Sequence, residues 1–308
     1  MNLFDKVPSP KAPKILQLLQ DFSNDPRQGK IDLGIGVYKD ETGITPVLET
    51  VKAAEKILVS EQKTKAYIGL AGDPIFCDLA SNLVLGDKLD LKRVNVIQTP
   101  GGSSALRVLY DLVFDVSPQS KIWLPTPTWD NHPPTIKASG LEFRYYRYFD
   151  PSSQAINFEQ TMEDFKNVRP GDVVLLHGCC HNPTGVNFSK SQWDMVAQVA
   201  LEVGFLPLVD IAYQGFGDGL DEDAYGVRKL IDHLPELLIA SSSSKNFAIY
   251  RDRAGVAITL SKNEKVSKAL GGRLRNLAGT NYSMPPDLSL IHISEPTRLR
   301  RISYAVFC

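Results

Sequence analysis

The stretch LLIASSSSKNFAIYRDRAG, residues 237–255, begins as an apolar strand and ends among polar and charged side chains. Four serines follow the apolar run, then Lys245, and eight residues later Arg253. For a single lysine, an exposed position after a strand is the more common case. An amine enclosed beside a guanidinium, however, has its charged form disfavoured and becomes nucleophilic. The stretch is therefore either a solvated turn or a site for a charged ligand with which the amine reacts.

Short apolar runs of this kind recur along the chain and alternate with helical patterns. Six of them are expected to be strands, at residues 94–97, 121–124, 173–176, 205–209, 237–240 and 254–260. Helical patterns lie between them at residues 104–113 and 191–203. Strands that are apolar almost throughout, with helices between them, are typical of a mostly parallel sheet covered on both faces. The sequence therefore predicts the α/β class, as a three-layer α/β/α sandwich.

The composition argues against several kinds of partner. The chain has 308 residues, with 34 basic and 35 acidic side chains, so no basic surface for nucleic acid is expected. Its N-terminal residues contain no apolar run long enough for a signal peptide or a membrane span. Residues 15–22 have instead the pattern of one amphipathic helix. We expect neither a nucleic-acid partner nor a membrane partner.

The four cysteines, Cys77, Cys179, Cys180 and Cys308, show no metal-binding or disulfide pattern. No CxxC spacing is present, and the adjacent pair at 179 and 180 cannot easily bridge itself. Histidines flank this pair in HGCCHN, but the spacing fits no common zinc site. We therefore expect no metal, reduced thiols and a cytoplasmic location.

Polar and glycine-rich segments follow five of the six strands. They read TPGGSSAL, PTPTWDNH, HGCCHNPTG, DIAYQGFGDG and SSSSKNF. In sheets of this kind ligands bind outside the carboxyl ends of the strands, so these segments are expected to meet at one site. The coincidence across five strands is a stronger signal than any segment alone.

Two of these segments carry groups that an anionic or charged ligand needs. Gly101, Gly102 and Ser103 let the backbone approach a ligand, and the N–H groups of the following helix make an anion site. Their spacing matches neither the P-loop nor the dinucleotide motif, which argues against ATP and NAD. Asp210 ends an apolar run, where a carboxylate needs a charged partner, and Tyr213 follows it with a phenolic donor. Taken alone, the glycine–serine segment is more simply a strand-to-helix turn with a serine cap, and Asp210 is equally well a helix cap or a surface acid.

The whole set of residues narrows the choice of ligand. A reactive lysine, an arginine, serines, a strand-end aspartate and a glycine–serine loop fit a ligand with an aldehyde, a phosphate and a basic ring nitrogen. Pyridoxal 5′-phosphate has all three groups, since lysine binds its aldehyde and aspartate holds the proton on its ring nitrogen. The sequence therefore predicts a pyridoxal phosphate site that contains Lys245 and Asp210.

These motifs together resemble a known family. Over residues 15–287, in order and at family spacing, the chain is similar to the class I aminotransferases of the aspartate and aromatic amino acid subgroup, which have fold type I of the pyridoxal phosphate enzymes. The motifs that carry the resemblance are SSSSKNFAIYRDRAG, HGCCHNPTG, LVDIAYQGFGDG, TPTWDNH, QTPGGSSALR and IDLGIGVYKDETG. The resemblance implies transamination between an aromatic amino acid or aspartate and a 2-oxo acid, in a homodimer with shared active sites.

The resemblance also implies roles for single residues. Lys245 would bind the aldehyde and carry the proton, Asp210 would pair with the ring nitrogen, and Tyr213 would bond the ring's phenolate oxygen. Further cofactor contacts would be Gly102, Ser103, Ser242 and Arg253 at the phosphate, Trp129 on the ring, His132 behind the aspartate, Asn182 beside the tyrosine, and Tyr67 at the phosphate of the neighbouring subunit. The substrate would meet Gly36, Trp129 and Asn182, and the Asn182–Pro183 bond would be cis. From the residues alone, Trp129 is equally a core side chain.

One position within the motifs departs from the family pattern. Gly279 stands three residues before Tyr282, where the family has an arginine that reads the distal carboxylate of a dicarboxylic substrate from the adjacent subunit. Glycine cannot make that bidentate contact. Dicarboxylate preference is therefore in doubt, and aromatic or other apolar side chains become more plausible substrates.

The resemblance stops at Asp287 and sets the expected domains. We expect residues 1–40 to be the N-terminal part of a small domain, 41–287 a large cofactor-binding domain, and 288–308 a non-family tail from an artificial end of the reading frame. The small domain would then be incomplete and would lack the arginine that grips the substrate α-carboxylate. An inactive cofactor-binding fragment is one alternative function, and a pyridoxal phosphate β-lyase or decarboxylase is another.

Overall fold

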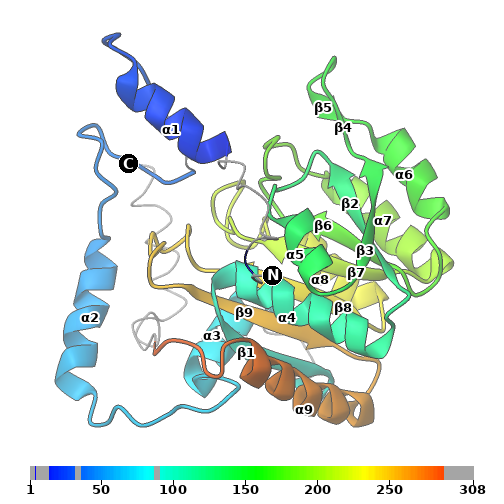
Figure 1. Cartoon of the computed structure of the whole chain (residues 1–308). Coiled ribbons are helices and arrows are strands. Elements are labelled where there is room, and N and C mark those ends of the chain that lie inside the picture. Colours follow the sequence, from blue (N-terminus) through cyan, green and yellow to red (C-terminus); the bar gives the residue numbers. More distant parts are fainter. Residues whose placement is uncertain (1–3, 5–13, 32–35, 87–90, 288–308) are drawn as a thin grey trace. The chain divides into compact units, whose positions relative to one another are not determined.

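The computed structural model describes residues 4, 14–31, 36–86 and 91–287 of the chain (Figure 1). The chain divides into two compact units, Met1–Pro46 and Val47–Cys308. The first unit holds helix α1, Lys14–Asn24, which confirms the amphipathic helix expected at residues 15–22. The expected tail at 288–308 lies outside the described residues. The assignment of residues 1–40 to a small domain stays a prediction.

The second unit contains the remaining elements. In chain order they are α2 (Glu49–Glu61), α3 (Pro74–Leu85), the 3₁₀ turn η2 (Leu91–Arg93), β1 (Val94–Pro100), α4 (Gly101–Val116), β2 (Lys121–Thr126), α5 (His132–Ala138), β3 (Glu142–Arg147), β4 (Phe149–Asp150), β5 (Ala155–Ile156), α6 (Phe158–Lys166), β6 (Val173–His177), α7 (Lys190–Val203), β7 (Leu206–Ile211), α8 (Tyr225–His233), β8 (Leu237–Ser242), β9 (Ala254–Leu260) and α9 (Glu264–Asn281). No helix in the described part of the chain is long and apolar enough to cross a bilayer.

A seven-stranded sheet with the order β1-β9-β8-β7-β6-β2-β3 forms the centre of this unit. The strand β9 runs antiparallel to both of its neighbours, whereas the other neighbouring strands pair in parallel. All six strands expected from the apolar runs are present, which confirms the mostly parallel α/β fold. The apolar runs do not include the edge strand β3, because its sequence EFRYYR is polar and mostly exposed.

Helices cover both faces of the sheet and make the expected three layers (Figure 1). Along β6, Val174 and Leu176 belong to a hydrophobic cluster with α6, α7 and α8. The alternate residues Val173 and Leu175 belong to a second cluster with α4, α5 and α9. A strand covered in this way has no polar side, which explains why β6 reads as an unbroken apolar run.

Local signals account for the position of the helices next to the strand ends. The helix α7 begins after Ser189, which forms a capping box with Gln192, and it ends at Gly204 with a left-handed φ of 80°. The helix α4 begins at Gly101, directly after β1, and Gly101 takes a φ of 76° that only glycine adopts readily. The first turn of α4 is thereby placed at the carboxyl edge of the sheet.

The direction of β9 decides which further residues reach that edge. Pro100 at the end of β1 pairs with Ala254, and Ser242 at the end of β8 pairs with Gly255. Because β9 is antiparallel, its first residues lie beside the last residues of its neighbours. Arg253, which precedes β9, therefore meets the segments that follow β1 and β8.

Candidate active site

The ends of β1 and β8 and the start of β9 form a cradle with very little side-chain volume. A Cβ atom added to Gly101 would lie 2.5 Å from Nη2 of Arg253, and one added to Gly102 would lie 3.0 Å from Cβ of Ser242. A Cβ atom on Gly255 would lie 2.7 Å from the backbone carbonyl carbon of Gly101. Glycine is therefore required for the three segments to approach one another so closely. We call this group of residues the phosphate cradle.

Hydrogen-bond donors gather around the phosphate cradle. Arg253 donates from Nη1 to Oγ of Ser244 at 3.2 Å and to the carbonyl oxygen of Tyr250 at 3.0 Å. The first N–H groups of α4, at Gly102 and Ser103, have no acceptor within their own helix. A guanidinium, serine hydroxyls and a helix N-terminus are the groups that bind phosphate in proteins. The cradle therefore fits the phosphate group of the expected cofactor.

Lys245 follows the serines of the cradle, and its Nζ lies 5.1 Å from the centre of the Tyr213 ring. Burial lowers the pKa of Lys245, the Asp210 carboxylate opposes this change, and the Arg253 guanidinium lowers the pKa further. The loss of solvation thus outweighs the attraction of the carboxylate. A neutral amine, which is the nucleophilic form, is favoured in comparison with an exposed lysine.

Asp210, near the end of β7, is held by a buried histidine. Its Oδ2 lies 3.2 Å from Nε2 of His132, and the His132 side chain is completely buried. Thr128 holds the other side of this ring, with its Oγ1 2.7 Å from Nδ1. Trp129 packs edge-on against the same ring, with the ring centroids 5.3 Å apart. The carboxylate therefore has a fixed position at the strand end, as a partner for a cationic ring nitrogen requires.

Tyr213 and Asn182 make a further contact within this group. The Asn182 side chain hydrogen-bonds to Tyr213, and its backbone N–H donates to Nδ1 of His177 at 3.3 Å. Burial raises the pKa of Tyr213 and the Asp210 carboxylate raises it further, so the phenol keeps its proton and can donate it in a hydrogen bond. The Asn182–Pro183 bond is cis, which confirms the expectation.

Three histidines form a row that starts at the partner of Asp210; His132 and His181 are buried and His177 is partly buried. The ring centroids of His132 and His177 are 5.4 Å apart, and those of His177 and His181 are 4.1 Å apart. Burial lowers the pKa of His177 well below its usual range and the pKa of His181 to about 4. Both rings are therefore neutral near pH 7 and place no further positive charge near the aspartate.

Four expected site residues remain to be described: Ser103, Trp129, Tyr67 and Gly36. Ser103 and Trp129 lie at the carboxyl edge and are partly buried. Tyr67, in the loop between α2 and α3, has 91% of its surface exposed and so makes little contact within its own chain. Gly36 is an exposed residue of the first unit, Met1–Pro46. The roles expected for Tyr67 and Gly36 therefore stay predictions.

Two residues of the site were not singled out by the sequence argument. Ser244 accepts the Arg253 hydrogen bond, and Thr128 orients His132. Both lie inside segments that the strand-end argument marks, SSSSKNF and PTPTWDNH. The sequence marks these two segments, but it does not show which of their hydroxyl groups faces the site.

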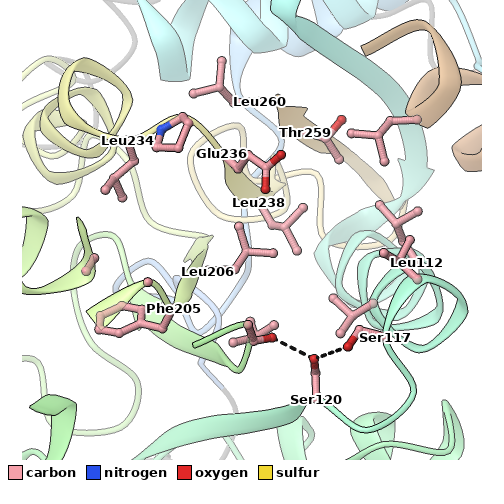
Figure 2. A pocket seen from close by; sticks show the side chains of 18 of the residues that line it. Leu112, Ser117, Ser120, Phe205, Leu206, Leu234, Glu236, Leu238, Thr259 and Leu260 are labelled. Carbon is pink, nitrogen blue, oxygen red and sulfur yellow. Dashed lines mark hydrogen bonds between the residues drawn. The ribbon is translucent and has the colours of Figure 1, made fainter. Parts of the chain in front are cut away.

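A cavity of about 470 Å³ lies at the opposite edge of the sheet (Figure 2). Leu206 and Leu238, near the starts of their strands, line it together with Leu112 of α4. The Ser120 hydroxyl in it is already hydrogen-bonded to Ser117 and to a backbone carbonyl oxygen. Among the described residues that line the cavity only Glu236 is ionisable, and it is exposed. The strand-end group, with its lysine and partly buried carboxylate, is therefore the candidate active site.

Comparison with known proteins identifies the family. Residues 28–290 match the family model of aminotransferase class I and II. The chain belongs to this aminotransferase family. The aromatic-amino-acid aminotransferase of Paracoccus denitrificans is 45% identical to it over 278 residues, which cover 90% of this chain and 71% of that protein. The aspartate aminotransferase of Salmonella typhi is 42% identical over 287 residues, which cover 92% and 72% of the two chains.

A solved structure shows the same fold. The aromatic-amino-acid aminotransferase from Burkholderia pseudomallei, covalently bound to pyridoxal phosphate, is 32% identical and superposes with a TM-score of 0.94 over 99% of this chain and 78% of that chain. The predicted family, fold and aminotransferase activity are confirmed by these findings. Family membership also supports the predicted cofactor, pyridoxal phosphate.

Proposed function

We propose that this aminotransferase binds pyridoxal phosphate at the strand-end group, with Lys245, Asp210 and Tyr213 as its catalytic residues. One observation carries the proposal: the phosphate cradle, a partly buried amine and a histidine-held carboxylate meet at one edge of one sheet. When bound, the cofactor supplies an electron sink for the electron pair released at the substrate Cα.

Each side chain has a defined part in holding the cofactor. The phosphate is bound by the N–H groups of Gly102 and Ser103, the Ser242 hydroxyl and the Arg253 guanidinium. At the other end of the cofactor, Asp210 accepts the ring N–H while His132 keeps the carboxylate in place, as their 3.2 Å separation allows. Tyr213 and Asn182 would bind the phenolate oxygen of the cofactor, and Trp129 would pack against its ring.

Lys245 moves the proton in this proposal. With the cofactor bound, its Nζ, as the neutral amine that loss of solvation favours, would accept the proton released at the Cα of the amino acid. Loss of solvation, aided by the Arg253 guanidinium, outweighs the opposing Asp210 carboxylate and favours the neutral base, so Lys245 would act at a pH where an exposed lysine is protonated. Substitution of this amine must therefore remove both cofactor attachment and proton transfer.

The variant Lys245→Ala tests the assignment. With added pyridoxal phosphate, the wild-type chain is expected to show the visible absorption of a lysine-linked cofactor and to form pyridoxamine phosphate with an amino acid. The variant is expected to lose both signals. The matched control is Lys262→Ala, an exposed lysine that follows β9 at the other edge of the sheet. Persistence of the lysine-linked absorption in Lys245→Ala would overturn the proposal.

We also propose that the amino donor is an aromatic amino acid rather than aspartate. Gly279, on α9, stands where the family has the arginine for the distal carboxylate. A Cβ atom there would lie 3.4 Å from a methyl carbon of Leu70, so the nearest neighbour is apolar. The Paracoccus relative carries an aromatic-amino-acid name, and a Rhizobium meliloti relative that is 46% identical is a tyrosine aminotransferase.

Restoring a guanidinium at this position tests the preference. In the wild type, kcat/KM for phenylalanine is expected to exceed that for aspartate. Gly279→Arg is expected to raise kcat/KM for aspartate, relative to kcat/KM for phenylalanine, by about 10- to 100-fold. This is the gain expected from one charge-assisted hydrogen-bonded pair. The control Gly272→Arg lies on the same helix, where an added Cβ meets no atom within 4 Å. A wild-type preference for aspartate would refute the proposed donor while leaving the cofactor assignment intact.

We further propose that the enzyme is a cytoplasmic homodimer whose subunits share their active sites. The exposure of Tyr67 leaves its hydroxyl available to a neighbouring subunit. The described cysteines, Cys77, Cys179 and Cys180, are unpaired, in keeping with a reducing compartment. Sedimentation of the purified chain is expected to show a dimer, and a monomer with full transaminase activity would contradict shared sites.

A further inference from the structure

Two cysteines and a buried aspartate lie together beside the active site, and none of them has a part in the proposed reaction. The Sγ atoms of Cys179 and Cys180 and a carboxylate oxygen of Asp223 all lie within 4.8 Å of one another. Cys179 and Asp223 are buried, and Cys180 is partly buried. We call these residues the dithiol cluster. Its cysteines follow β6, and its aspartate stands just before α8.

The backbone at Cys180 brings the two thiols together. In an extended chain, successive side chains point to opposite sides, so adjacent thiols would be separated. Cys180 instead takes a left-handed φ of 46°, a conformation uncommon for any residue other than glycine. The two sulfurs, although they belong to adjacent residues, therefore lie within 4.8 Å of each other.

Asp223 is held with its carboxylate toward the thiols. Its Oδ2 accepts hydrogen bonds from the backbone N–H groups of Gly215 and Gly217, at 2.8 and 2.9 Å. Its Oδ1 accepts one from the N–H of Asp218 at 2.9 Å. A carboxylate has about four positions for accepting such bonds, so these three contacts fix its orientation and still leave room for one ligand bond.

We propose that Cys179, Cys180 and Asp223 form a binding site for a thiophilic divalent cation of the zinc group. Two sulfurs and one carboxylate oxygen, completed by a water molecule, make the four-coordinate set that Zn²⁺ prefers, and thiolates select zinc-like cations over magnesium or calcium. Sequence spacing cannot show this set, because Asp223 lies far along the chain from the cysteines.

The geometry needs only a small adjustment. With metal–sulfur bonds of about 2.3 Å, two sulfurs on a tetrahedral cation are roughly 3.8 Å apart. The ligand atoms of the dithiol cluster are no more than 4.8 Å apart, so side-chain rotation has to close at most about 1 Å.

The charge balance also favours binding. Both thiols give their protons to solvent as the cation enters, and two metal–sulfur bonds replace two S–H bonds. The two protons that leave carry the same charge as the divalent cation that enters, so binding does not change the net charge of the cluster. This lowers the cost of placing a cation in a largely buried site.

The site can be measured by loading the holoenzyme with Cd²⁺. The full chain, reduced with a phosphine and carrying its cofactor, is equilibrated with Cd²⁺ and dialysed, and bound cadmium is counted by elemental analysis. Sulfur-to-cadmium ultraviolet absorption identifies thiolate ligation. We expect one cadmium per chain in the wild type. In Cys180→Ser the affinity for Cd²⁺ should fall by roughly 10- to 100-fold or more. Loss of a residue that only supports a metal ligand already costs about this much, and Cys180 is itself a proposed ligand.

Matched variants separate this site from other thiols. Cys77→Ser removes a buried thiol elsewhere in the second unit, and Cys308→Ser removes the last cysteine of the sequence; both are expected to keep the cadmium. Cys179→Ser provides a second test should Cys180→Ser fail to fold, with thermal melting as the check on folding. Equal cadmium loading in the wild type and in a folded Cys179→Ser or Cys180→Ser variant would overturn the proposal, as would the absence of cadmium from the wild type.

Discussion

The substitution Gly101→Ala would place a methyl group inside the phosphate cradle. The added Cβ would lie 2.5 Å from Nη2 and 2.9 Å from Cζ of Arg253, well inside normal contact distance. Backbone on the other side of the cradle, at Gly255, leaves Gly101 no room to withdraw. The guanidinium is the end of a flexible side chain, so it is the group that moves, by about 1 Å.

Two separate costs follow from this substitution. Alanine at the left-handed φ of 76° costs about 1–2 kcal/mol of folding free energy. Displacement of Arg253 breaks its 3.2 Å hydrogen bond to Ser244 and its contact with the phosphate. A hydrogen bond to a charged group is worth about 1.5–3 kcal/mol, which corresponds to an increase of roughly 10- to 100-fold in the Kd for pyridoxal phosphate.

Both costs can be measured on the same protein. Titration of the cofactor-free variant with pyridoxal phosphate, followed by visible absorption, gives the Kd, and thermal melting without cofactor gives the stability. The Tm should fall by roughly 2–4 °C per kcal/mol. Gly272→Ala is the control, because its Cβ would meet no atom within 4 Å. Wild-type cofactor affinity in Gly101→Ala, with the expected loss of Tm, would show that Arg253 does not hold the phosphate.

Two further predictions concern the stability of the fold. Gly226→Ala would bring a Cβ to 2.2 Å from the ring of the buried Trp193, so it should cost about 1–3 kcal/mol, seen as a lower Tm that Gly272→Ala does not share. The pKa of His181 is lowered from 6.5 to about 4, so the unfolded chain binds this proton first as the pH falls. The free energy of unfolding should therefore drop by about 3 kcal/mol between pH 6.5 and pH 4 because of His181. Denaturant unfolding of His181→Gln at several pH values should lack this part of the pH dependence. The control His233→Gln, at an exposed histidine, should keep it.

Most of the candidate site lies in segments that local sequence pattern marks. The apolar runs mark the buried strands, and the segments that follow them contain Gly102, Asp210 and Lys245. A parallel sheet brings such segments to one edge, so their meeting could be predicted from secondary structure alone. The edge strand β3 escaped this argument because only a strand buried on both faces reads as an apolar run.

Contacts between distant segments needed the folded chain. Arg253 precedes its strand, and only the antiparallel direction of β9 explains why it lies beside Gly101. The pairing of Asp223 with Cys179 and Cys180 is of the same kind, since it depends on how the segment after β7 folds back onto the end of β6.

The amino-acid order by itself determined the class of fold, the aminotransferase family and the residue types available for chemistry, because burial pattern and motif spacing are properties of neighbouring residues. The tertiary structure alone decided contacts that no local pattern shows: the guanidinium against the glycines, Thr128 against His132, and two thiols against one carboxylate. The physical reason is that strand direction and loop path set distances between residues far apart in the chain, and hydrogen bonding, desolvation and metal ligation all act over a few ångströms.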